Sequence, residues 1–323
     1  MIYHIKNKVR NLSHRNSFIN KLYLISNRIK VSLLSILSDE KFAKMKYKEN
    51  TGRTLNLESP KTFNEKLWWL KLNNRDPLLT KCSDKVRVRE YVKECGLEHI
   101  LNEVYGVYDN ANDIDFDELP DKAFIKTNHG SGTNIIWDRN KPFDKAKFRK
   151  KFNRALKKNY YWQSREWNYK NIEPKIIVEK ILEDKENKSL IDYRFLCFNG
   201  VVKMIFVDIE TAAEDGSHSP YAKRNVYDKD FNYLNIKVKR EQFDSSTIEK
   251  PINFDKMIEY AEQLSKPFPF CRVDLYNING DICFGEITFY PGGATQIVEP
   301  EEWELKMGEW IDLKNEKIIL ENA

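Results

Sequence analysis

The sequence predicts an α+β fold, and two observations support that expectation. Helical patterns come first along the chain, at 62–74 and 83–96, and strands become frequent only after residue 120. Two long segments, 192–210 and 271–290, each contain two apolar strands joined through an Asn-Gly pair, a strong signal for an antiparallel hairpin. Helices followed by mixed helices and hairpins favour α+β over a doubly wound parallel sheet.

The composition is that of a globular protein with a basic N-terminal arm. Hydrophobic residues make up 41% and charged residues 32% of the 323 residues, and the net charge is +5. Residues 1–50 contain eleven Lys and Arg and three acids, a net charge of +8, which leaves −3 for the other residues. Because the body is mildly acidic, we expect no nucleic-acid partner.

The arm has two interpretations. The one we favour is a helix packed on the body with its basic side in water. The alternative is peripheral contact with an anionic membrane surface or with a biosynthetic partner. The five cysteines form no CxxC pair and no export signal is recognisable, so we expect a cytoplasmic protein, with the inner face of the cell membrane as the alternative site for the arm.

Start and stop residues bound the predicted helices. Thr62 followed by Glu65 is a capping box, and Ser83 and Gly96 are the expected cap and stop of the second helix. An acidic connector at 109–121 is a plausible domain boundary. The remaining elements are a helix at 143–159, a strand at 175–182 and a helix at 255–265.

The segment AFIKTNHGSGTNIIW, residues 123–137, is predicted to be a hairpin with a glycine-rich tip. Both flanks resemble strands, and neither of the common nucleotide-binding glycine motifs is present. Amide groups at Ser131, Gly132 and Thr133 are suited to an anion nest, and Lys126 stands at the base of the loop. An ordinary glycine turn beside an exposed lysine is the alternative.

The C-terminal hairpin places charged residues together. If Gly280 is the centre of the turn, Asp274 faces Glu286 and Arg272 faces Thr288. This inward set also includes Tyr276 and Phe284, whereas the opposite face is suited to a core. A tight Asn279-Gly280 turn places the two acids on opposite faces, so we predict an odd-length connection or a β-bulge.

Two facing carboxylates on a half-buried sheet repel each other unless a cation lies between them. Mg²⁺ that bridges Asp274, Glu286 and phosphate oxygens is the natural candidate, and Arg272 is placed to hold a transferring phosphoryl group. A surface ion cluster of Arg272 with Asp274 is the alternative. In the middle hairpin, a two-residue Asn199-Gly200 turn puts three charged residues on one face, which is either a site wall or exposed to solvent: Asp192, Arg194 and Lys203.

The ordered set of these stretches resembles the ATP-grasp superfamily, to which D-alanine–D-alanine ligase belongs. It is most similar to the TupA-like ATP-grasp proteins of bacterial surface-polysaccharide (capsule) gene clusters. The resemblance lies in KTFNEKLWWLKL, DKVRVREYV, LPDKAFIKTNHGSGTNII, IIVEKIL, DYRFLCFNG and EITFYPGG. It implies two α+β subdomains whose antiparallel sheets grip ATP. The implied parts are a basic helical arm (1–50), a helical region (51–120), a lid subdomain (121–182) and a larger subdomain with the metal site (183–323).

The resemblance also implies roles for individual residues. Arg272 and Lys126 would act on the reacting phosphoryl group. Contacts to ATP would come from Lys85, Lys126, Ser131, Gly132, Thr133, Glu179, Lys180, Leu182, Asp192 and Lys203, with the backbone of 179–182 reading the adenine edge and Asp192 the ribose. Mg²⁺ would be bound by Asp274, Glu286 and Thr288. Substrate contacts would come from Arg194, Lys223 and Arg224, the last two in or beside the loop 211–225.

Thr288 departs from the wider superfamily, which usually has Asn at this position. A hydroxyl is a weaker metal ligand than an amide oxygen, so water fills that position or the activity is reduced. The activity implied is that of a carboxylate–amine ligase that uses ATP and Mg²⁺. The polysaccharide setting implies a uronic-acid carboxylate and an amino acid or other amine as substrates.

Two alternatives remain open from the sequence. A glycosyltransferase would use the DIDFD segment, whose Asp113, Asp115 and Asp117 have the spacing of a sugar-nucleotide metal site, although a solvated connector is the more ordinary interpretation. A non-catalytic nucleotide-binding module is the second alternative, which the substitution at Thr288 supports.

Overall fold

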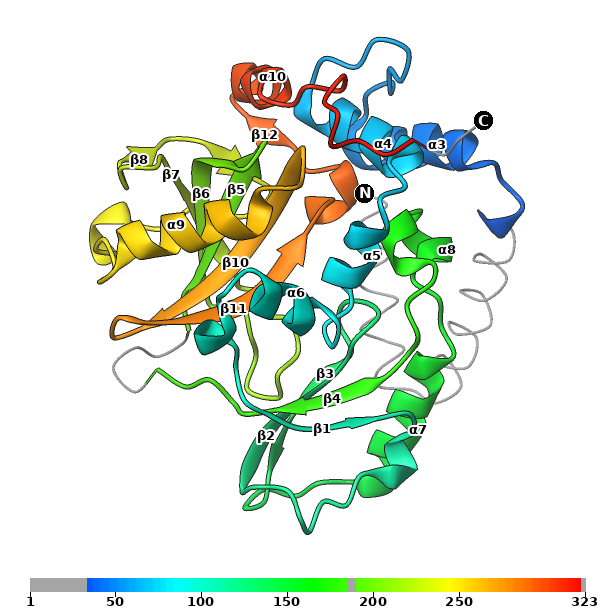
Figure 1. Ribbon diagram of the computed structural model, residues 1–323, viewed down its shortest axis with the longest axis vertical. Helices are drawn as coiled ribbons and strands as arrows, with labels where there is room; N and C mark the ends of the chain where they lie inside the picture. Colours follow the sequence, from blue (N-terminus) through cyan, green and yellow to red (C-terminus); the bar gives the residue numbers. More distant parts are fainter. Residues whose placement is uncertain (1–33, 185–189, 321–323) are drawn as a thin grey trace.

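The computed structural model describes residues 34–184 and 190–320 and consists of two α+β units, each built on an antiparallel sheet (Figure 1). This confirms the predicted fold class. The N-terminal 33 residues lie outside the described residues, so the membrane interpretation of the arm stays a prediction. Within the described residues, no helix has the length and apolar character needed to cross a bilayer.

The smaller unit is a lid formed by a four-stranded sheet in the order β1-β4-β2-β3. Ala123 and Ile125 pack against Phe148 and Phe152 of α7, which covers one face of this sheet (Figure 1). Lys126 alternates with them and therefore faces the larger unit. The strands are β1 (Val104–Tyr108), β2 (Lys122–Thr127), β3 (Asn134–Asp138) and β4 (Ile176–Glu179), and α7 spans Lys145–Leu156.

The larger unit is a six-stranded sheet in the order β11-β10-β5-β6-β7-β8. Its core face packs under α9 (Phe254–Ser265), which contacts β10, β5 and β6. A separate pair joins β9 (Lys237–Val238) to β12 (Val298–Glu299). The strands of the main sheet are β5 (Asp192–Phe198), β6 (Val201–Ile209), β7 (Lys223–Tyr227), β8 (Tyr233–Leu234), β10 (Phe270–Ile278) and β11 (Asp281–Thr288).

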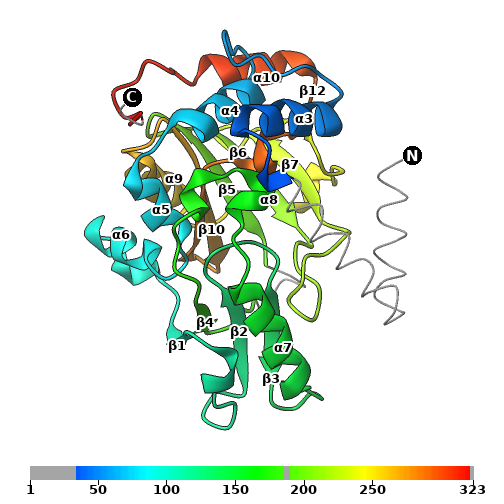
Figure 2. The same cartoon turned by 90° about the vertical axis from the view of Figure 1, so that its right-hand side faces the viewer.

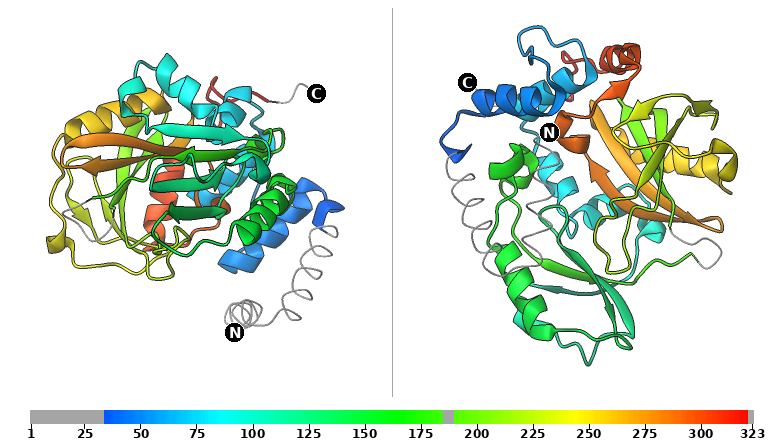
Figure 3. Two further views of the ribbon diagram at one scale, coloured as in Figure 1. Left: turned by 90° about the horizontal axis from the view of Figure 1, so that it is seen from below. Right: turned by 180° about the vertical axis from the view of Figure 1, so that it is seen from behind.

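Helices from both ends of the chain cover the end of the larger unit that is remote from the lid (Figure 2, Figure 3). They include α3 (Asp39–Thr51), α4 (Phe63–Asn73) and α10 (Glu301–Glu309), and α10 packs on α4. Thr62 caps α4 with the predicted capping box. The short elements are α5 (Pro77–Ser83), α6 (Val88–Glu94), α8 (Tyr161–Ser164), η1 (Glu98–Ile100), η2 (Ala111–Asp113), η3 (Trp167–Tyr169), η4 (Ser245–Thr247) and η5 (Pro291–Ala294).

The structure corrects the predicted helix at 83–96. This helix is shorter: α6 spans Val88–Glu94, and Ser83 is the last residue of the preceding helix α5 instead of the cap of α6. Asp84 separates them, because its side chain accepts hydrogen bonds from the amides of Val86 and Arg87 and fixes a turn.

The lid also begins earlier than the predicted boundary at residue 121. Strand β1 pairs with β4, and Ile114 and Phe116 lie in the lid core. The acidic connector therefore belongs to the lid, and its exposed aspartates alternate with buried apolar residues. Asp117 pairs with Lys145, which fits a solvated surface better than the metal site of a glycosyltransferase.

Candidate functional site

The C-terminal hairpin positions the two predicted metal ligands through a bulge. Asn279 and Gly280 both have positive φ and form a tight turn, after which the pairs run in simple register up to Leu275 with Phe284. The register then shifts by one residue, and Asp274 lies opposite Glu286. The predicted bulge is confirmed.

The sequence prediction placed Phe284 on the wrong face of this hairpin. Because Phe284 pairs with Leu275 before the register shift, its ring joins the hydrophobic core and not the site face. Gly285 occupies the bulge, and a Cβ added there would lie 2.9 Å from the backbone oxygen of Asp274.

Replacing Gly285 with Ala is therefore expected to displace Asp274 and Glu286 relative to each other. The added methyl forces the bulge to shift, since the atom it meets is backbone, and we expect a cost of about 1–3 kcal/mol in the free energy of unfolding. Urea denaturation checks the cost, and nucleotide turnover should fall as well. A fully stable Gly285→Ala variant with unchanged turnover would contradict this role of the bulge.

One guanidinium group joins the two acids. Arg272 donates through Nε and Nη2 to the Asp274 carboxylate, both at 2.6 Å, and Nη2 lies 3.2 Å from Glu286 Oε1. The Thr288 hydroxyl donates to Glu286 at 3.0 Å and accepts from Arg272 at 3.1 Å. Arg194 Nη1 lies 3.2 Å from Asp274 Oδ2. The predicted pair faces one another, and Thr288 orients its neighbours.

The electrostatics distinguish the two acids. Burial raises the pKa of Asp274, although Arg272 and Arg194 act to lower it. Burial acts in the same direction on Glu286, but Lys85, Arg272 and Arg194 outweigh it and lower its pKa to about 2. The Glu286 side chain is 42% exposed, and its Oε2 has no partner among the described residues. An ionised, accessible carboxylate beside a buried one is suited to binding a cation.

These residues fit Mg²⁺ on their donor chemistry. Carboxylate oxygens are its preferred protein ligands, and it usually keeps waters and takes phosphate oxygens besides. Within the part of the chain that the structure describes, no group of three or more His, Cys, Asp or Glu could hold a metal ion by itself. A cation at Asp274 and Glu286 would therefore take its remaining ligands from phosphate and water.

Lysines from the lid side face this pair. Lys126 Nζ lies 2.6 Å from Glu179 Oε2 across the lid sheet. Lys85 Nζ donates to the carbonyl of Gly130 at 2.9 Å, so it is tied to the glycine-rich tip. Burial lowers the pKa of Lys85, which also interacts electrostatically with Glu286, Lys126 and Glu179. Two cations therefore stand between the sheets.

The glycine-rich tip closes as predicted and is covered by a loop of the larger unit. Thr127 donates its amide to the Thr133 carbonyl at 3.2 Å, and Ser131 and Gly132 are exposed at the tip. The loop 210–222 reaches across to β3, where the amide of Ile136 donates to Asp215 at 3.1 Å. Gly216 makes this approach possible, since its φ is +82° and a Cβ would lie 3.1 Å from the Ile136 nitrogen.

His218 is a site residue that sequence analysis missed. It lies on this loop with Nε2 3.5 Å from Ser131 Oγ, at the mouth between lid and sheet. Burial lowers its pKa, and the charges of Glu286, Arg240 and Arg194 also act on its imidazole ring. An isolated histidine in a polar loop gave no signal in the sequence.

The predicted hinge segment needs one correction. The Lys180 amide donates to the Glu103 carbonyl at 3.0 Å, and its own carbonyl accepts from Asn102 Nδ2 at 2.7 Å. Its amide is therefore not free to bind an adenine edge, whereas its carbonyl can accept a second hydrogen bond, and the adenine contact of Lys180 stays a prediction. Leu182 lies beyond the end of β4 and makes no such bond among the described residues, so it remains a candidate as well.

The middle hairpin also contains a bulge, which the sequence analysis missed. The register shifts between Leu196 and Cys197, and Lys203 is left unpaired near the Asn199-Gly200 turn. Lys203 is exposed at the end of the hairpin away from Asp192, so its assignment to the nucleotide site was wrong. Asp192 stays on the site face, where its carboxylate lies 3.2 Å from Arg194 and accepts from Thr211 at 2.6 Å.

Arg224 was also placed wrongly. Its side chain is buried, and its Nε and Nη2 each donate to Asp208 at 2.6 Å, so it is not available to a substrate carboxylate. Asp208 is the centre of an ion cluster that sequence analysis missed. Lys223 has intermediate exposure and no ion pair among the described residues, and its assignment stays a prediction.

A buried acid and lysine lie beside the site. Burial raises the pKa of Glu166 to about 7 and lowers that of Lys71 to about 8. The Lys71 ammonium donates to the Gly293 carbonyl at 2.8 Å and lies 3.6 Å from the Trp68 ring centre. Glu166 also raises the pKa of the neighbouring Tyr160 by its charge. With a pKa of about 7, the Glu166 carboxyl changes its charge close to neutral pH.

We expect Glu166 to make stability pH-dependent. Because its folded pKa lies above the unfolded value near 4.5, the native state holds the proton longer, and the free energy of unfolding falls as pH rises from about 5 to 7. The fall should amount to about 1–3 kcal/mol. Urea denaturation at pH 5, 6 and 7 checks this. Glu166→Gln should flatten the profile, and an unchanged slope in that variant would contradict the assignment.

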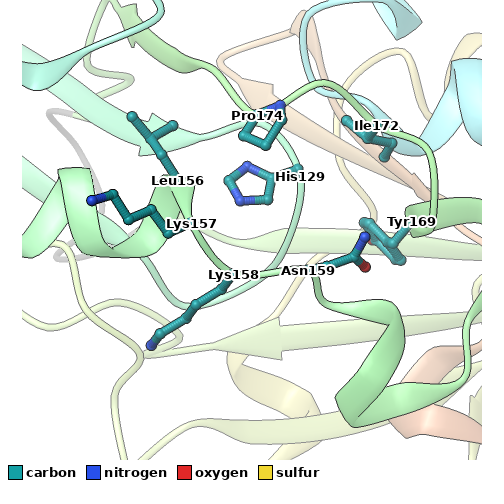
Figure 4. A pocket seen from close by; sticks show the side chains of 8 residues that line it. All are labelled: His129, Leu156, Lys157, Lys158, Asn159, Tyr169, Ile172 and Pro174. Carbon is teal, nitrogen blue, oxygen red and sulfur yellow. The ribbon is translucent and has the colours of Figure 1, made fainter. Parts of the chain in front are cut away.

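A cavity lies beside His129 of the glycine-rich loop, between the end of α7 and residues 169–174 (Figure 4). The His129 ring stands in it, held by Asn128 Oδ1 at 3.1 Å and the Ala155 carbonyl at 3.2 Å. Lys157 and Lys158 line the rim but extend away from that ring (Figure 4). Neither Asp274 nor Glu286 lines this cavity.

Comparison of the sequence with known families gives one match that spans most of the chain. The TupA-like ATP-grasp family matches residues 65–312. The chain belongs to this family. The match includes both hairpins and the glycine-rich tip, and so covers the whole site of this ATP-grasp protein. No curated protein sequence matches this one.

Solved structures show distant likeness. An L-amino acid ligase from Bacillus licheniformis is 13% identical, with a TM-score of 0.39 over 66% of this chain and 44% of its own. The D-alanine–D-alanine ligase of Bacillus anthracis, solved with ATP, is 14% identical, with a TM-score of 0.39 over 72% and 66%. The ligase PsnB, solved with a precursor variant, Mg and ADP, is 10% identical, with a TM-score of 0.35 over 73% and 57%. The ATP-grasp chain thus spans less than half the length of the amino acid ligase.

Proposed function

We propose that this ATP-grasp protein is an ATP-dependent carboxylate–amine ligase. The observation that carries the proposal is the bulge-set pair Asp274 and Glu286, which faces Lys85 and Lys126 under a glycine-rich tip. Phosphoryl transfer needs mainly positioning and neutralisation of charge, and this arrangement offers both without a nucleophilic side chain. When bound, Mg²⁺ would neutralise the phosphate oxygens.

The residues suggest a division of labour. A substrate carboxylate oxygen attacks the γ-phosphorus of ATP, and the bond to ADP breaks, which gives an acylphosphate and ADP. An amine then attacks the acyl carbon, phosphate leaves, and the amine loses a proton, so that an amide forms. Arg272 is placed to hold the transferring group beside the metal pair, and Lys85 and Lys126 to hold the remaining phosphates.

For the substrate we propose a uronic-acid carboxylate of a bacterial surface polysaccharide or its precursor, joined to an amino acid or another amine in the cytoplasm. The support is the resemblance to the polysaccharide-associated branch. We further propose no nucleic-acid partner, because the site is lined by both signs of charge and not by a continuous basic face.

The experiment is a screen for ADP release with Mg²⁺, ATP, a panel of uronic acids and hydroxylamine, which traps acylphosphates as hydroxamates. We expect hydroxamate with at least one acid. Lys126→Met should lower the rate about 10²–10³-fold, because a cation that faces the phosphates is lost. Lys145→Met, on α7 at the opposite face of the lid sheet, where its lysine pairs with Asp117, is the control.

Two results would contradict the proposal. The first is the absence of hydroxamate across the panel together with tight nucleotide binding, which would favour a non-catalytic module. The second is turnover of sugar nucleotides without ATP, which would favour a glycosyltransferase.

A further inference from the structure

The buried carboxylate of Asp208 is surrounded by three guanidinium groups. The Asp208 carboxylate is fully buried and bound at both oxygens by Arg224. Arg240 Nη1 adds a third bond at 2.6 Å, and Arg194 Nε lies 2.8 Å away. A carboxylate is satisfied by a single bidentate arginine, so Arg240 adds a guanidinium group that Asp208 does not require.

The three arginines of this cluster differ in how many of their donor groups are bound within the protein. Arg224 is buried and lies over the Phe206 ring at 4.4 Å, which makes it structural. Arg194 is shared among Asp208, Asp192 and Asp274, three acids in all. Arg240 is the exception, since its side chain is 27% exposed and its Nε and Nη2 bind no described residue.

Lys239 places a further positive charge next to Arg240. It takes a left-handed backbone conformation, with φ of +64°, which non-glycine residues adopt only at some cost. It is exposed and has no ion pair among the described residues. Lys239 lies within electrostatic reach of Arg240 and Arg224, so these cations share one region.

This region adjoins the carboxylate pair Asp274 and Glu286. Arg194 bridges the two, since Nε reaches Asp208 at 2.8 Å and Nη1 reaches Asp274 at 3.2 Å. His218, on the loop 210–222, interacts electrostatically with both Glu286 and Arg240. An anion at Arg240 would therefore lie along the sheet from the reacting phosphate, about one arginine side chain away from Asp274.

We propose that Arg240 and Lys239 form a second anion subsite, which binds a carboxylate that is not the one phosphorylated. The inference rests on the proposed function for the identity of the reacting group, and it names a substrate class: a molecule with an additional acid. That acid belongs either to the amine-bearing substrate, as in an amino acid, or to the donor, as in an acidic oligosaccharide.

The test is equilibrium binding, so it does not depend on turnover. The full chain, saturated with Mg²⁺ and a non-hydrolysable ATP analogue, is titrated calorimetrically with two matched pairs of probes. Glycine against glycinamide tests an acceptor carboxylate, and digalacturonate against galacturonate tests a second acid on the donor. We expect the member of one pair with the additional carboxylate to bind about 10-fold tighter or more.

Variants assign that preference to the subsite. Arg240→Met and Lys239→Met should each reduce it to about 3-fold or less, while affinity for the nucleotide analogue stays within about 2-fold of wild type. Lys237→Met is the matched control on the same segment, since its lysine pairs with Glu241, and it should keep the preference. Thermal melts of each variant report whether it is folded.

The outcomes are decisive in either direction. The pair that shows the preference identifies the source of the acid. If neither pair shows one, or if both Arg240→Met and Lys239→Met retain it, the subsite does not exist. Absence of hydroxamate in the turnover screen would refute the ligase proposal alone, because the binding preference is measured without any reaction.

Discussion

Asp274→Asn is expected to lower ADP release about 10²–10³-fold at saturating Mg²⁺ and ATP. Asn has nearly the same shape, but it removes the negative charge and one of the two acceptor oxygens of the carboxylate. Glu286 is then the remaining acid, and its Oε1 is already bound by the Thr288 hydroxyl and Arg272. A single carboxylate supplies too few ligands to hold the metal ion alone. Initial rates across a Mg²⁺ titration measure the effect.

The variant must be compared with a folded control. Asp281→Asn, at the exposed end of the same hairpin, removes one acid without touching the pair and should retain full turnover. Circular dichroism and a thermal melt establish that the Asp274→Asn chain is folded. If folded Asp274→Asn releases ADP at the wild-type rate, the divalent cation is bound elsewhere.

Asp208→Asn is expected to produce the largest loss of stability, about 3–5 kcal/mol in the free energy of unfolding. The substitution leaves the buried Arg224 guanidinium without its counter-charge, and both Arg240 and Arg194 lose a partner. Urea denaturation at pH 7 measures the loss. The exposed Asp121 with its partner Arg139 provides the control, because removal of a surface pair costs at most about 1 kcal/mol.

The same residue makes a pH-dependent prediction. Burial alone would raise the pKa of Asp208, but Arg224, Arg194 and Arg240 hold it well below the usual carboxylate range. A depressed folded pKa means that the stabilisation is complete above the unfolded pKa, near 4, and is lost as pH falls further. The difference between wild type and Asp208→Asn should therefore stay constant from pH 7 to about 5 and narrow below 4. A gap that narrows already between pH 7 and 5 would contradict the ion cluster.

The facing arrangement of Asp274 and Glu286 was predictable because two independent constraints met on one hairpin. The Asn-Gly dipeptide fixes a two-residue turn, and the charged residues share a face only if one residue is inserted. Together they required a bulge, and Gly285 provides it. The hairpin at Asn199-Gly200 has no such pattern of acids, so nothing in its sequence revealed the bulge that displaces Lys203.

The Asp208 cluster could not be predicted, because its members meet only in the folded chain. Asp208 ends an apolar run that reads as a core strand, while Arg224 and Arg240 follow 16 and 32 residues later. The lid boundary was missed for a related reason. Negative charge in the segment 109–121 conceals the alternation that buries Ile114 and Phe116.

The most direct test of the account is the position of a divalent cation in crystals grown with Mn²⁺ and a non-hydrolysable ATP analogue. Anomalous scattering from manganese marks the ion without reference to activity. The account predicts one peak in contact with oxygens of both Asp274 and Glu286, about 2.0–2.3 Å from each, with Lys126 turned toward the phosphates. A peak remote from this pair, or nucleotide bound while both acids remain paired only with arginine, would contradict it.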